Sequence, residues 1–259
     1  MVLTMAPRRS TASVRSVERT LDLLMALERA EQPLGLSELA RIVDIPKTTA
    51  QRLLGVLERR GFVQKERGSY QLGAGIVPLA GAFLAGNSLA KAALPVLEEL
   101  AALSGETVSL QVRQGFDRVV VQRVRSPHSL GYTLNIGQRL PLHVGASGKV
   151  LMASMPEEEL RQFLEPLGEF RLADGETVTR EELLERLRQL RLEGFAVSLG
   201  EREVGVVSLA VPVVRPGGGT IAALAVTGPP TRMTQERVEQ LSIEVRRAAR
   251  EVARLYSRM

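Results

Sequence analysis

The chain has 259 residues, of which 44% are hydrophobic, so its length and composition predict two domains with separate cores. It contains no cysteine and only two histidines, which excludes disulfides and thiolate metal sites, and we expect no metal and no cofactor. It has no run of 18 apolar residues and no secretory signal at its start, so we expect a cytoplasmic protein with no membrane partner.

The positive charge is concentrated near the N-terminus. Residues 1–75 contain 12 Lys or Arg against 8 Asp or Glu, whereas the remaining residues contain 22 against 21. This asymmetry favours an N-terminal module that binds an anion, and nucleic acid is the commonest large anion in a cytoplasm. An ordinary basic surface is the alternative interpretation.

Two helices are predicted first. The apolar residues of the first recur at spacings of four, three and three along one face: Val17, Leu21, Leu24 and Leu27. Residues 32–35 interrupt this pattern, and Ser37 is the expected N-cap of a second helix of about two turns.

A third helix is expected to start at Pro46 and to end near Arg60, with Gly61 as its stop. Its apolar face consists of Ala50, Leu53, Leu54 and Leu57. Its outward face is polar and basic, and Gly55 keeps that face low. A short helix, a tight turn and a helix with such a face are typical of a helix-turn-helix. A three-helix bundle with one solvated face is the alternative.

A hairpin is predicted directly after the third helix. Residues 62–66 and 69–72 alternate apolar and polar side chains around Arg67-Gly68, which indicates the wing of a winged helix. We expect base contacts from Thr48, Thr49, Gln51 and Arg52. We expect phosphate contacts from Lys47, Arg59, Lys65 and Arg67, and a basic arm with Arg8, Arg9 and Arg15 could add to them.

Several motifs resemble one family of bacterial regulators. The segments SVERTLDLLMAL, LSELARIVDIPKTTAQRLLGVLERRGFV and YQLG resemble the DNA-binding domain of the IclR family, and the resemblance continues through GETVSLQV, RLPLHVGASGKVLMA, GFAVSLGEREVGVVSLAVPV and IAALAVTGPPTRMTQERV. It implies an α+β protein in which a winged helix-turn-helix is joined to a GAF-like effector-binding domain. It also implies dimers or tetramers on double-stranded operator DNA. We therefore assign residues 1–75 to the DNA-binding domain, 76–104 to a helical linker and 105–259 to the effector-binding domain.

The linker and the C-terminal domain are predicted from local patterns. Two linker helices are expected, broken at Gly86-Asn87 and at Pro95. Strands are expected over residues 107–112, 119–124, 206–214 and 221–227, which indicates a largely antiparallel sheet. Capping boxes are expected at Ser154 with Glu157 and at Thr179 with Glu182, and Thr234 is expected to cap the last helix.

A turn of small residues at 145–149 is the candidate anion site. It is not a P-loop, because His143 replaces the required glycine and Val150 replaces the Ser or Thr that binds Mg²⁺. We expect a helix from about Val150, with the backbone N–H groups of Ala146 and Ser147 facing a carboxylate or another small anion. Tight helix packing, which also needs small side chains, is the alternative.

The family resemblance adds further pocket residues. It implies that the turn is joined by Leu140, Ser198, Ser208, Ala225 and Thr227. The family often has an acidic residue near Ser198, a Cys or small residue at Ser208 and a serine at Ala225, so this pocket departs from the organic-acid pattern. Glu201 and Glu203 are expected in a solvated loop, and His143 is expected to be structural.

These observations predict a transcription regulator whose operator affinity is modulated by a small molecule, such as a small organic acid or an aromatic metabolite. The sequence does not determine whether it acts as an activator or a repressor. It has neither a G-x-S-x-G elbow nor a metal signature, so we expect no enzymatic activity. The two alternatives are a winged helix that docks on protein and a small-molecule enzyme without a DNA-binding role.

Overall fold

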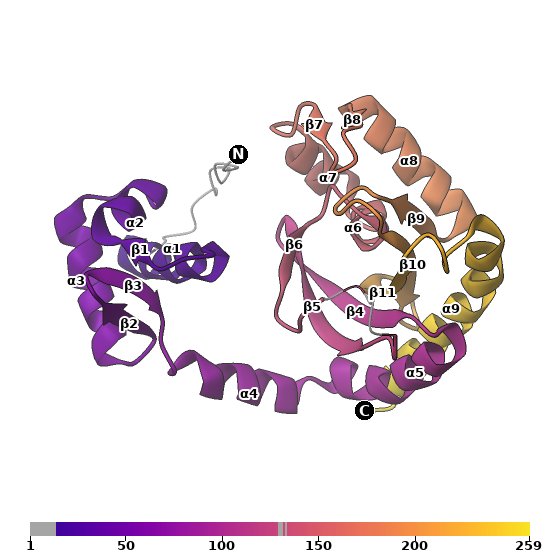
Figure 1. Ribbon diagram of the computed structural model, residues 1–259, viewed down its shortest axis with the longest axis horizontal. Coiled ribbons are helices and arrows are strands. Elements are labelled where there is room, and N and C mark those ends of the chain that lie inside the picture. The colour runs from indigo at the N-terminus through magenta and orange to yellow at the C-terminus, as the bar shows by residue number, and fades with distance from the viewer. Residues whose placement is uncertain (1–13, 129–131, 133) are drawn as a thin grey trace. The chain divides into compact units, whose positions relative to one another are not determined.

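The computed structural model describes residues 14–128, 132 and 134–259. It divides into two compact units at Gly86 and Asn87, and each unit has its own core (Figure 1). The division falls within residues 76–104, which were assigned above to a linker. The two helices of that segment belong to different units, because the second packs into the core of the C-terminal unit.

The first unit is a winged helix. Its elements are α1 (Arg15–Arg29), β1 (Leu34–Gly35), α2 (Leu36–Ile42), α3 (Lys47–Arg59), β2 (Val63–Glu66), β3 (Ser69–Leu72) and α4 (Ile76–Gly86). The strands form an antiparallel sheet in the order β1-β3-β2. The predicted core face of α3 is confirmed, because Ala50, Leu53, Leu54 and Leu57 are its buried residues. Arg60 is its C-cap, and Gly61 follows with φ +75°, as a helix stop requires.

The predicted N-cap at Ser37 is wrong. Gly35 occupies the cap position of α2 without a side-chain hydrogen bond, so Ser37 lies inside the helix. The cause is β1, which the sequence analysis did not anticipate. Leu34 pairs with Tyr70 of the wing, and this pairing holds the backbone extended until Gly35.

The predicted core face of α1 is only partly right. Val17 and Leu21 are 55% and 53% exposed, whereas Leu23, Ala26 and Leu27 are buried. The helix is rotated from the predicted orientation, because it packs through these three residues against α3 and β3. The spacing of apolar residues therefore identified the helix correctly and its buried face incorrectly.

The second unit is an α+β domain built on one sheet of six antiparallel strands, in the order β6-β5-β4-β11-β10-β9. These strands are β4 (Thr107–Gln114), β5 (Asp117–Val124), β6 (Arg139–Pro141), β9 (Ala196–Leu199), β10 (Val207–Val214) and β11 (Thr220–Gly228). The helices are α5 (Ser88–Ser104), α6 (Ala146–Ala153), α7 (Glu157–Leu164), α8 (Arg180–Glu193) and α9 (Gln235–Tyr256), and β7 (Phe170–Arg171) pairs with β8 (Thr177–Val178). All four predicted strands are present, and β6 and β9 are additional.

Helices cover both faces of this sheet (Figure 1). Alternate residues of each strand point to opposite faces, so Leu224 and Val226 of β11 pack with α5 and α9. Ala223 and Ala225 face the other way, into a core shared with α6, α7 and α8. The small alanine side chains allow α6 to approach the sheet closely.

Several predicted helix boundaries in this unit differ from the structure. Pro95 lies inside α5 rather than breaking it. The cost of the missing N–H is reduced because Pro95 and Lys91, whose carbonyl the N–H would have bonded, are both exposed. The predicted capping box at Ser154 is absent, since Ser154 is the C-cap of α6 and Pro156 precedes α7.

Two predicted helix caps are confirmed. Thr179 and Glu182 form the reciprocal hydrogen bonds of a capping box at the start of α8, and Thr234 accepts from the N–H of Arg237 at the start of α9.

No single helix in the described part of the chain is long and apolar enough to cross a membrane, and α4 and α5 pass that test of length and composition only when they are combined.

Candidate DNA interface and effector site

The turn before α3 is fixed by the core of the first unit. Asp44 adopts φ +52°, a left-handed conformation that asparagine and aspartate tolerate better than most residues. The next residue, Ile45, is 8% exposed, and its N–H donates to the carbonyl of Ala40 at 2.9 Å. The buried isoleucine thus anchors the turn and sets the direction in which α3 leaves it.

The outward face of α3 carries the predicted contact residues. The exposed members of the predicted set on this helix are Lys47, Thr48, Gln51, Arg52 and Arg59. Thr49 is half-buried, so it is the least accessible of the predicted base contacts. Gly55 has no side chain, and a Cβ there would lie 3.7 Å from the guanidinium of Arg59. This face has the polar and basic character that a helix in a major groove requires.

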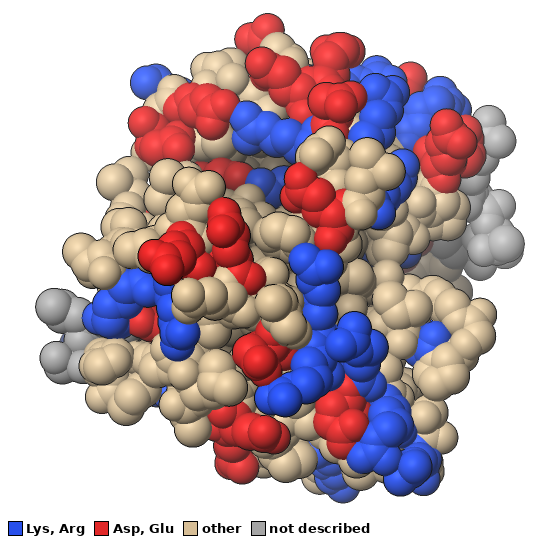
Figure 2. All heavy atoms as spheres, turned by 90° about the vertical axis from the view of Figure 1, so that its right-hand side faces the viewer, with Lys and Arg blue, Asp and Glu red and all other residues tan. Residues whose placement is uncertain are grey.

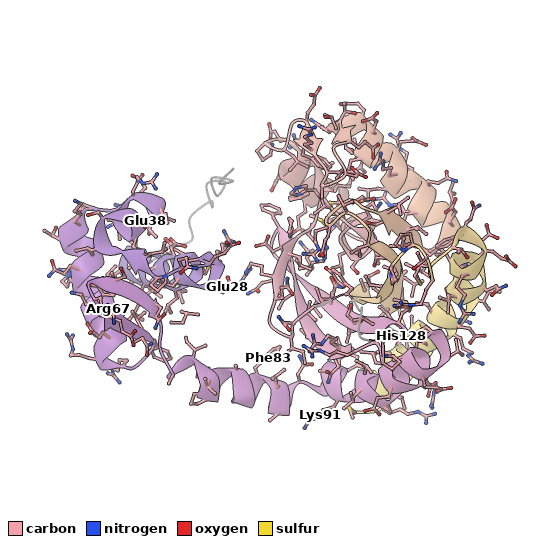
Figure 3. All side chains as sticks on the ribbon, in the orientation of Figure 1. Glu28, Glu38, Arg67, Phe83, Lys91 and His128 are labelled. Atoms are coloured by element: carbon pink, nitrogen blue, oxygen red, sulfur yellow. The ribbon has the colours of Figure 1, made fainter. Side chains whose placement is uncertain are left out.

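The wing has a tight turn with a basic tip. Glu66 pairs with Ser69, and the two residues between them have positive φ, +49° for Arg67 and +88° for Gly68, as a type I′ turn requires. Arg67 extends from this tip (Figure 3). Lys65 lies opposite Tyr70, and its ammonium is 5.2 Å from the centre of the Tyr70 ring. Arg8 and Arg9 lie outside the described residues, and Arg15 is the first residue of α1.

The glycine of the YQLG segment joins the wing to the end of α3. The N–H of Gly73 donates to the carbonyl of Phe62 at 2.8 Å. A Cβ on Gly73 would overlap the carbonyl oxygen of Gly61. Only glycine allows these two backbone segments to come so close, and the contact fixes the position of the wing beside α3.

The second unit contains a cavity of about 40 Å³ that brings most of the predicted pocket residues together. Six of the seven line it: Leu140, Ala146, Ser147, Ser198, Ser208 and Thr227. The seventh, Ala225, does not line the cavity, because it is fully buried in the core beneath α6.

The start of α6 forms one side of this cavity. Gly145 is the N-cap with φ +83°, and the helix begins at Ala146, four residues earlier than predicted. Ala146 and Ser147 are buried, and their backbone N–H groups have no hydrogen-bond acceptor among the described residues. The first turn of α6 therefore has unpaired donors, where a negative charge is stabilised.

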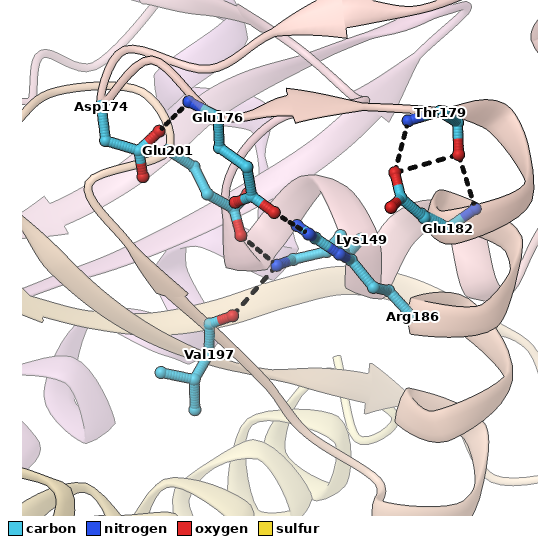
Figure 4. Close-up of polar contacts among 8 residues, drawn as sticks. All are labelled: Lys149, Asp174, Glu176, Thr179, Glu182, Arg186, Val197 and Glu201. Carbon is cyan, nitrogen blue, oxygen red and sulfur yellow. Dashed lines mark hydrogen bonds and ion pairs between the residues drawn. The ribbon is translucent and has the colours of Figure 1, made fainter.

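A buried ion pair supports this helix start. The ammonium of Lys149 bonds to Glu201 and, at 3.0 Å, to the carbonyl of Val197 (Figure 4). The other oxygen of Glu201 accepts from the N–H of Gly145 at 2.7 Å. The expectation that Glu201 lies in a solvated loop is wrong, because its side chain is 8% exposed. By contrast, the side chain of Glu203 is 58% exposed.

Arg118 is the residue of the site that the sequence analysis missed. It is 3% exposed, lines the cavity and comes from β5. Its Nε donates to Gln111 at 2.8 Å, and its Nη1 donates to the carbonyls of Pro141 at 2.5 Å and Val144 at 2.6 Å. Burial, followed by the charge of Arg202, lowers the pKa of Arg118 to about 9, so the guanidinium is charged at neutral pH.

Gly148 leaves space for the guanidinium of Arg118, because it has no side chain. A Cβ on Gly148 would overlap both the Nη1 of Arg118 and the carbonyl oxygen of Leu142. The G-x-x-G spacing of Gly145 and Gly148 thus serves the approach of α6 to Arg118 rather than the binding of a nucleotide. This spacing was the signal in the sequence that could have indicated a bulky side chain against the helix start.

Two hydroxyl groups line another part of the cavity. Ser208 of β10 and Thr227 of β11 are register partners, and their hydroxyl oxygens are 3.0 Å apart. Ser198 of β9 is paired with Ser208 from the other side. Each hydroxyl can donate or accept, so this side offers adaptable hydrogen bonds to a polar ligand.

His143 packs beside the site rather than in it. Its ring contacts that of Phe170 edge to face, with the ring centres 4.8 Å apart. Burial lowers the pKa of His143, the charge of Arg118 lowers it further, and Asp117 opposes both. The geometry agrees with the structural role expected of this residue. Among the described residues, no group of three His, Cys, Asp or Glu side chains could hold a metal ion.

A larger cavity of about 380 Å³ lies between α5 and α9. Its charged side chains are largely paired along α9, as in Arg247 with Glu244 and Arg254 with Glu251. The face that carries α8 and α9 shows basic and acidic groups interspersed (Figure 2). This cavity lacks the buried, directed donors of the smaller one, so we assign the candidate site to the smaller cavity.

Both units match models of one protein family. Residues 16–67 match the IclR helix-turn-helix domain, and residues 81–254 match the C-terminal domain of bacterial transcriptional regulator IclR. The chain belongs to the IclR family. An IclR-family chain with both domains is a DNA-binding transcription regulator modulated by a small-molecule effector.

Individual relatives support this assignment over nearly the whole chain. Transcriptional repressor IclR of Escherichia coli K12 is 30% identical over 254 residues, which are 96% of this chain and 93% of that protein. HTH-type transcriptional repressor AllR of Salmonella paratyphi A is 30% identical over 241 residues, 92% of this chain and 89% of that protein. A crystal structure of an IclR family regulator from Brucella abortus has a TM-score of 0.80 at 26% identity and covers 94% of this chain and 93% of that chain.

Proposed function

We propose that this IclR-family regulator reads its operator with α3 in a major groove and the wing on the flanking backbone. The single observation that carries the proposal is the exposed polar and basic face of α3. The residues proposed to lie nearest the bases are Thr48, Thr49, Gln51 and Arg52. Those proposed to contact mainly phosphates are Lys47, Arg59, Lys65 and Arg67.

The regulator acts as a homodimer or a dimer of dimers on a roughly palindromic operator. Helix α4 supports this part of the proposal, because none of its residues is buried although Val77, Leu79 and Phe83 are large and apolar.

The variant Phe83→Glu tests this interface. It should weaken the dimer, because it places a charge among the exposed apolar residues of α4, and analytical ultracentrifugation measures the association. Lys91→Glu is the control, since Lys91 is an exposed polar residue of the neighbouring helix α5 (Figure 3). Equal association of both variants would exclude α4 from the interface.

An effector binds in the smaller cavity of the second unit, at Leu140, Ala146, Ser147, Ser198, Ser208 and Thr227. The convergence of these residues on one cavity supports this part. An effector that prefers one arrangement of the oligomer changes operator affinity by the same coupling free energy. The two relatives named above are repressors, which supports repression as the action of this protein.

Operator binding is tested with the purified protein and its own promoter DNA at several salt concentrations. We expect specific binding that weakens as salt rises, because Lys and Arg displace counterions from phosphates. Arg52→Ala should reduce the preference for the operator by about tenfold. Arg161→Ala, an exposed arginine of α7 in the other unit, should keep it. Unchanged affinity in Arg52→Ala would contradict the proposed orientation of α3.

The same experiment separates the alternative functions. A winged helix that docks on protein would bind promoter and unrelated DNA equally weakly.

We propose binding without catalysis in the cavity, because the relatives are regulators. Unchanged ligand recovered after long incubation with the protein is the expected result, and turnover would overturn it. A regulator of operator DNA acts in the cytoplasm, where a bacterial chromosome lies.

A further inference from the structure

Gly55 and Val56 are adjacent residues of α3 that the core of the first unit does not require. Val56 is 43% exposed, and neither residue is among the buried residues of the helix. Glycine and the β-branched valine are both poorer helix formers than alanine or leucine. Both residues therefore lower the helix propensity of α3 without adding a buried side chain to the core.

The surroundings of Gly55 leave room for a side chain. Outside the helix backbone and the adjacent residues, the nearest atom to a Cβ on Gly55, in the described part of the chain, is the Nη1 of Arg59. It lies at 3.7 Å, an ordinary van der Waals distance. By contrast, a Cβ on Gly73 or Gly148 would overlap a backbone carbonyl oxygen. The fold requires those two glycines but not Gly55, and a helical glycine of this kind suits the close approach of another molecule.

The two residues lie on either side of Arg52, on the face of α3 that is proposed to enter the groove. With about 3.6 residues per turn, Val56 lies about 40° to one side of Arg52 and Gly55 about 60° to the other. Val56 is the one large hydrophobic side chain exposed on α3, a helix that the structure describes completely. An apolar spot thus interrupts a polar and basic face. In the major groove, the base edges present one apolar group, the C5-methyl of thymine.

We propose that Gly55 and Val56 form an apolar contact for the C5-methyl group of a thymine in the operator, which makes Val56 a specificity-determining residue. The proposal rests on the orientation of α3 described under the proposed function. Gly55 lets the helix approach the base edges, and Val56 packs on the methyl group. The positions of Arg52 and Val56 are about 6 Å apart along the helix, and stacked base pairs are about 3.4 Å apart. The thymine therefore lies within about two base pairs of the base that Arg52 contacts.

Replacement of thymine by uracil tests the proposal, because uracil lacks the methyl group and keeps the hydrogen-bonding groups of the base edge. Operator duplexes with uracil at one thymine at a time are titrated with the full-length protein, and fluorescence anisotropy measures the affinity. We expect one thymine of each half-site at which uracil weakens binding by about fourfold, which corresponds to the loss of one buried methyl group. If uracil is tolerated at every thymine, the proposal is wrong.

Variants of Val56 identify the side chain that contacts the methyl group. Val56→Ala should bind the thymine and uracil duplexes equally at that position. Ile42→Ala is the matched control, because Ile42 is 42% exposed in the neighbouring helix α2, and this variant should keep the difference. A difference that survives in Val56→Ala would assign the methyl contact to another side chain, such as Thr48, and would overturn the proposal.

The variant Gly55→Ala separates close approach from helix stability. Alanine is the better helix former, so the variant should unfold at a higher temperature. Its added methyl group should hold α3 away from the base edges, so operator binding should weaken more than binding to unrelated DNA. A variant that is more stable and binds the operator as tightly as the unaltered protein would overturn the role of Gly55.

The outcomes also distinguish this inference from the proposed function. Operator preference that depends on Arg52 but on no thymine methyl group would reject the apolar contact and support the orientation of α3. Operator binding that changes neither in Arg52→Ala nor with uracil would reject that orientation, and the contact with it.

Discussion

Arginines serve both units of this protein in opposite surroundings. Arg52, Arg59 and Arg67 of the DNA-binding unit are exposed, whereas Arg118 of the effector unit is 3% exposed. Water solvates the exposed charges, so they cost little and their attraction to DNA is screened by salt. The buried charge is costly unless neighbouring groups compensate it. Exposed arginines are therefore suited to contacts with DNA, whereas the buried one depends on the groups around it within its own unit.

Substitution of Glu201 should have the largest effect, because it removes the counter-ion of a buried charge. In Glu201→Gln the buried ammonium of Lys149 loses its counter-ion. We expect the free energy of unfolding of the second unit to fall by about 3 kcal/mol, measured by urea denaturation. Glu203→Gln is the matched control and should cost less than about 0.5 kcal/mol, since its side chain is largely exposed. Similar small losses in both variants would show that Glu201 is solvated.

Removal of an exposed arginine should have a moderate effect that depends on salt. Arg67→Ala at the tip of the wing should weaken binding to specific and unrelated DNA alike. The slope of log affinity against log salt should fall by about 1. Arg52→Ala should mainly reduce the preference for operator, by about tenfold. Fluorescence anisotropy at several salt concentrations measures both quantities. A loss of preference in Arg67→Ala would reverse the assigned roles.

One threonine and one serine test the helix starts of the two units, with a smaller effect on stability. Thr179→Ala removes the capping box of α8 and should cost the second unit about 1 kcal/mol. Ser37→Ala should cost the first unit almost nothing, because Ser37 is not the N-cap of α2. Thermal unfolding followed by circular dichroism measures both. A larger cost at Ser37 would restore the cap that the sequence predicted.

The smallest expected effect is a shift in the pKa of His143, which depends on the charge of Arg118. Its folded-state pKa is lowered, so neutral His143 stabilises the folded unit above pH of about 6.5, and this contribution is lost as pH falls. Arg118→Gln removes a nearby positive charge and should raise the pKa of His143. An NMR titration of its ring protons measures this shift, with Arg161→Gln as the control. No change in Arg118→Gln would mean that Arg118 carries no charge in the folded state.

The first unit could be predicted closely because its signals are local. The core face of α3, the glycine after it and the turn at Arg67-Gly68 each depend on residues a few positions apart. The errors arose where a distant segment decides the local structure. The short strand β1 pairs with β3 and thereby moves the cap of α2 from Ser37 to Gly35.

The effector site could be predicted only in part, because its charges come from separate strands. Spacing alone cannot show that Glu201 reaches Gly145 and Lys149 across the fold. Arg118 stands between Asp117 and a run of valines, where an arginine is normally an exposed strand residue. Its guanidinium is held by Gln111 of β4 and by the carbonyls of Pro141 and Val144, and no local pattern in the sequence indicates these contacts. The family resemblance supplied the small residues of the pocket but not this cation.

The hydrogen bonds at Asn87 cap the first helix of the second unit with a residue of that same unit. The side-chain oxygen of Asn87 accepts from the N–H of Ala90 at 3.0 Å, and its carbonyl accepts from Lys91 at 3.1 Å. A chain cut between Gly86 and Asn87 would therefore keep the side-chain cap of α5. That position is a suitable fusion point, at which the effector-binding unit could be joined to another DNA-binding domain.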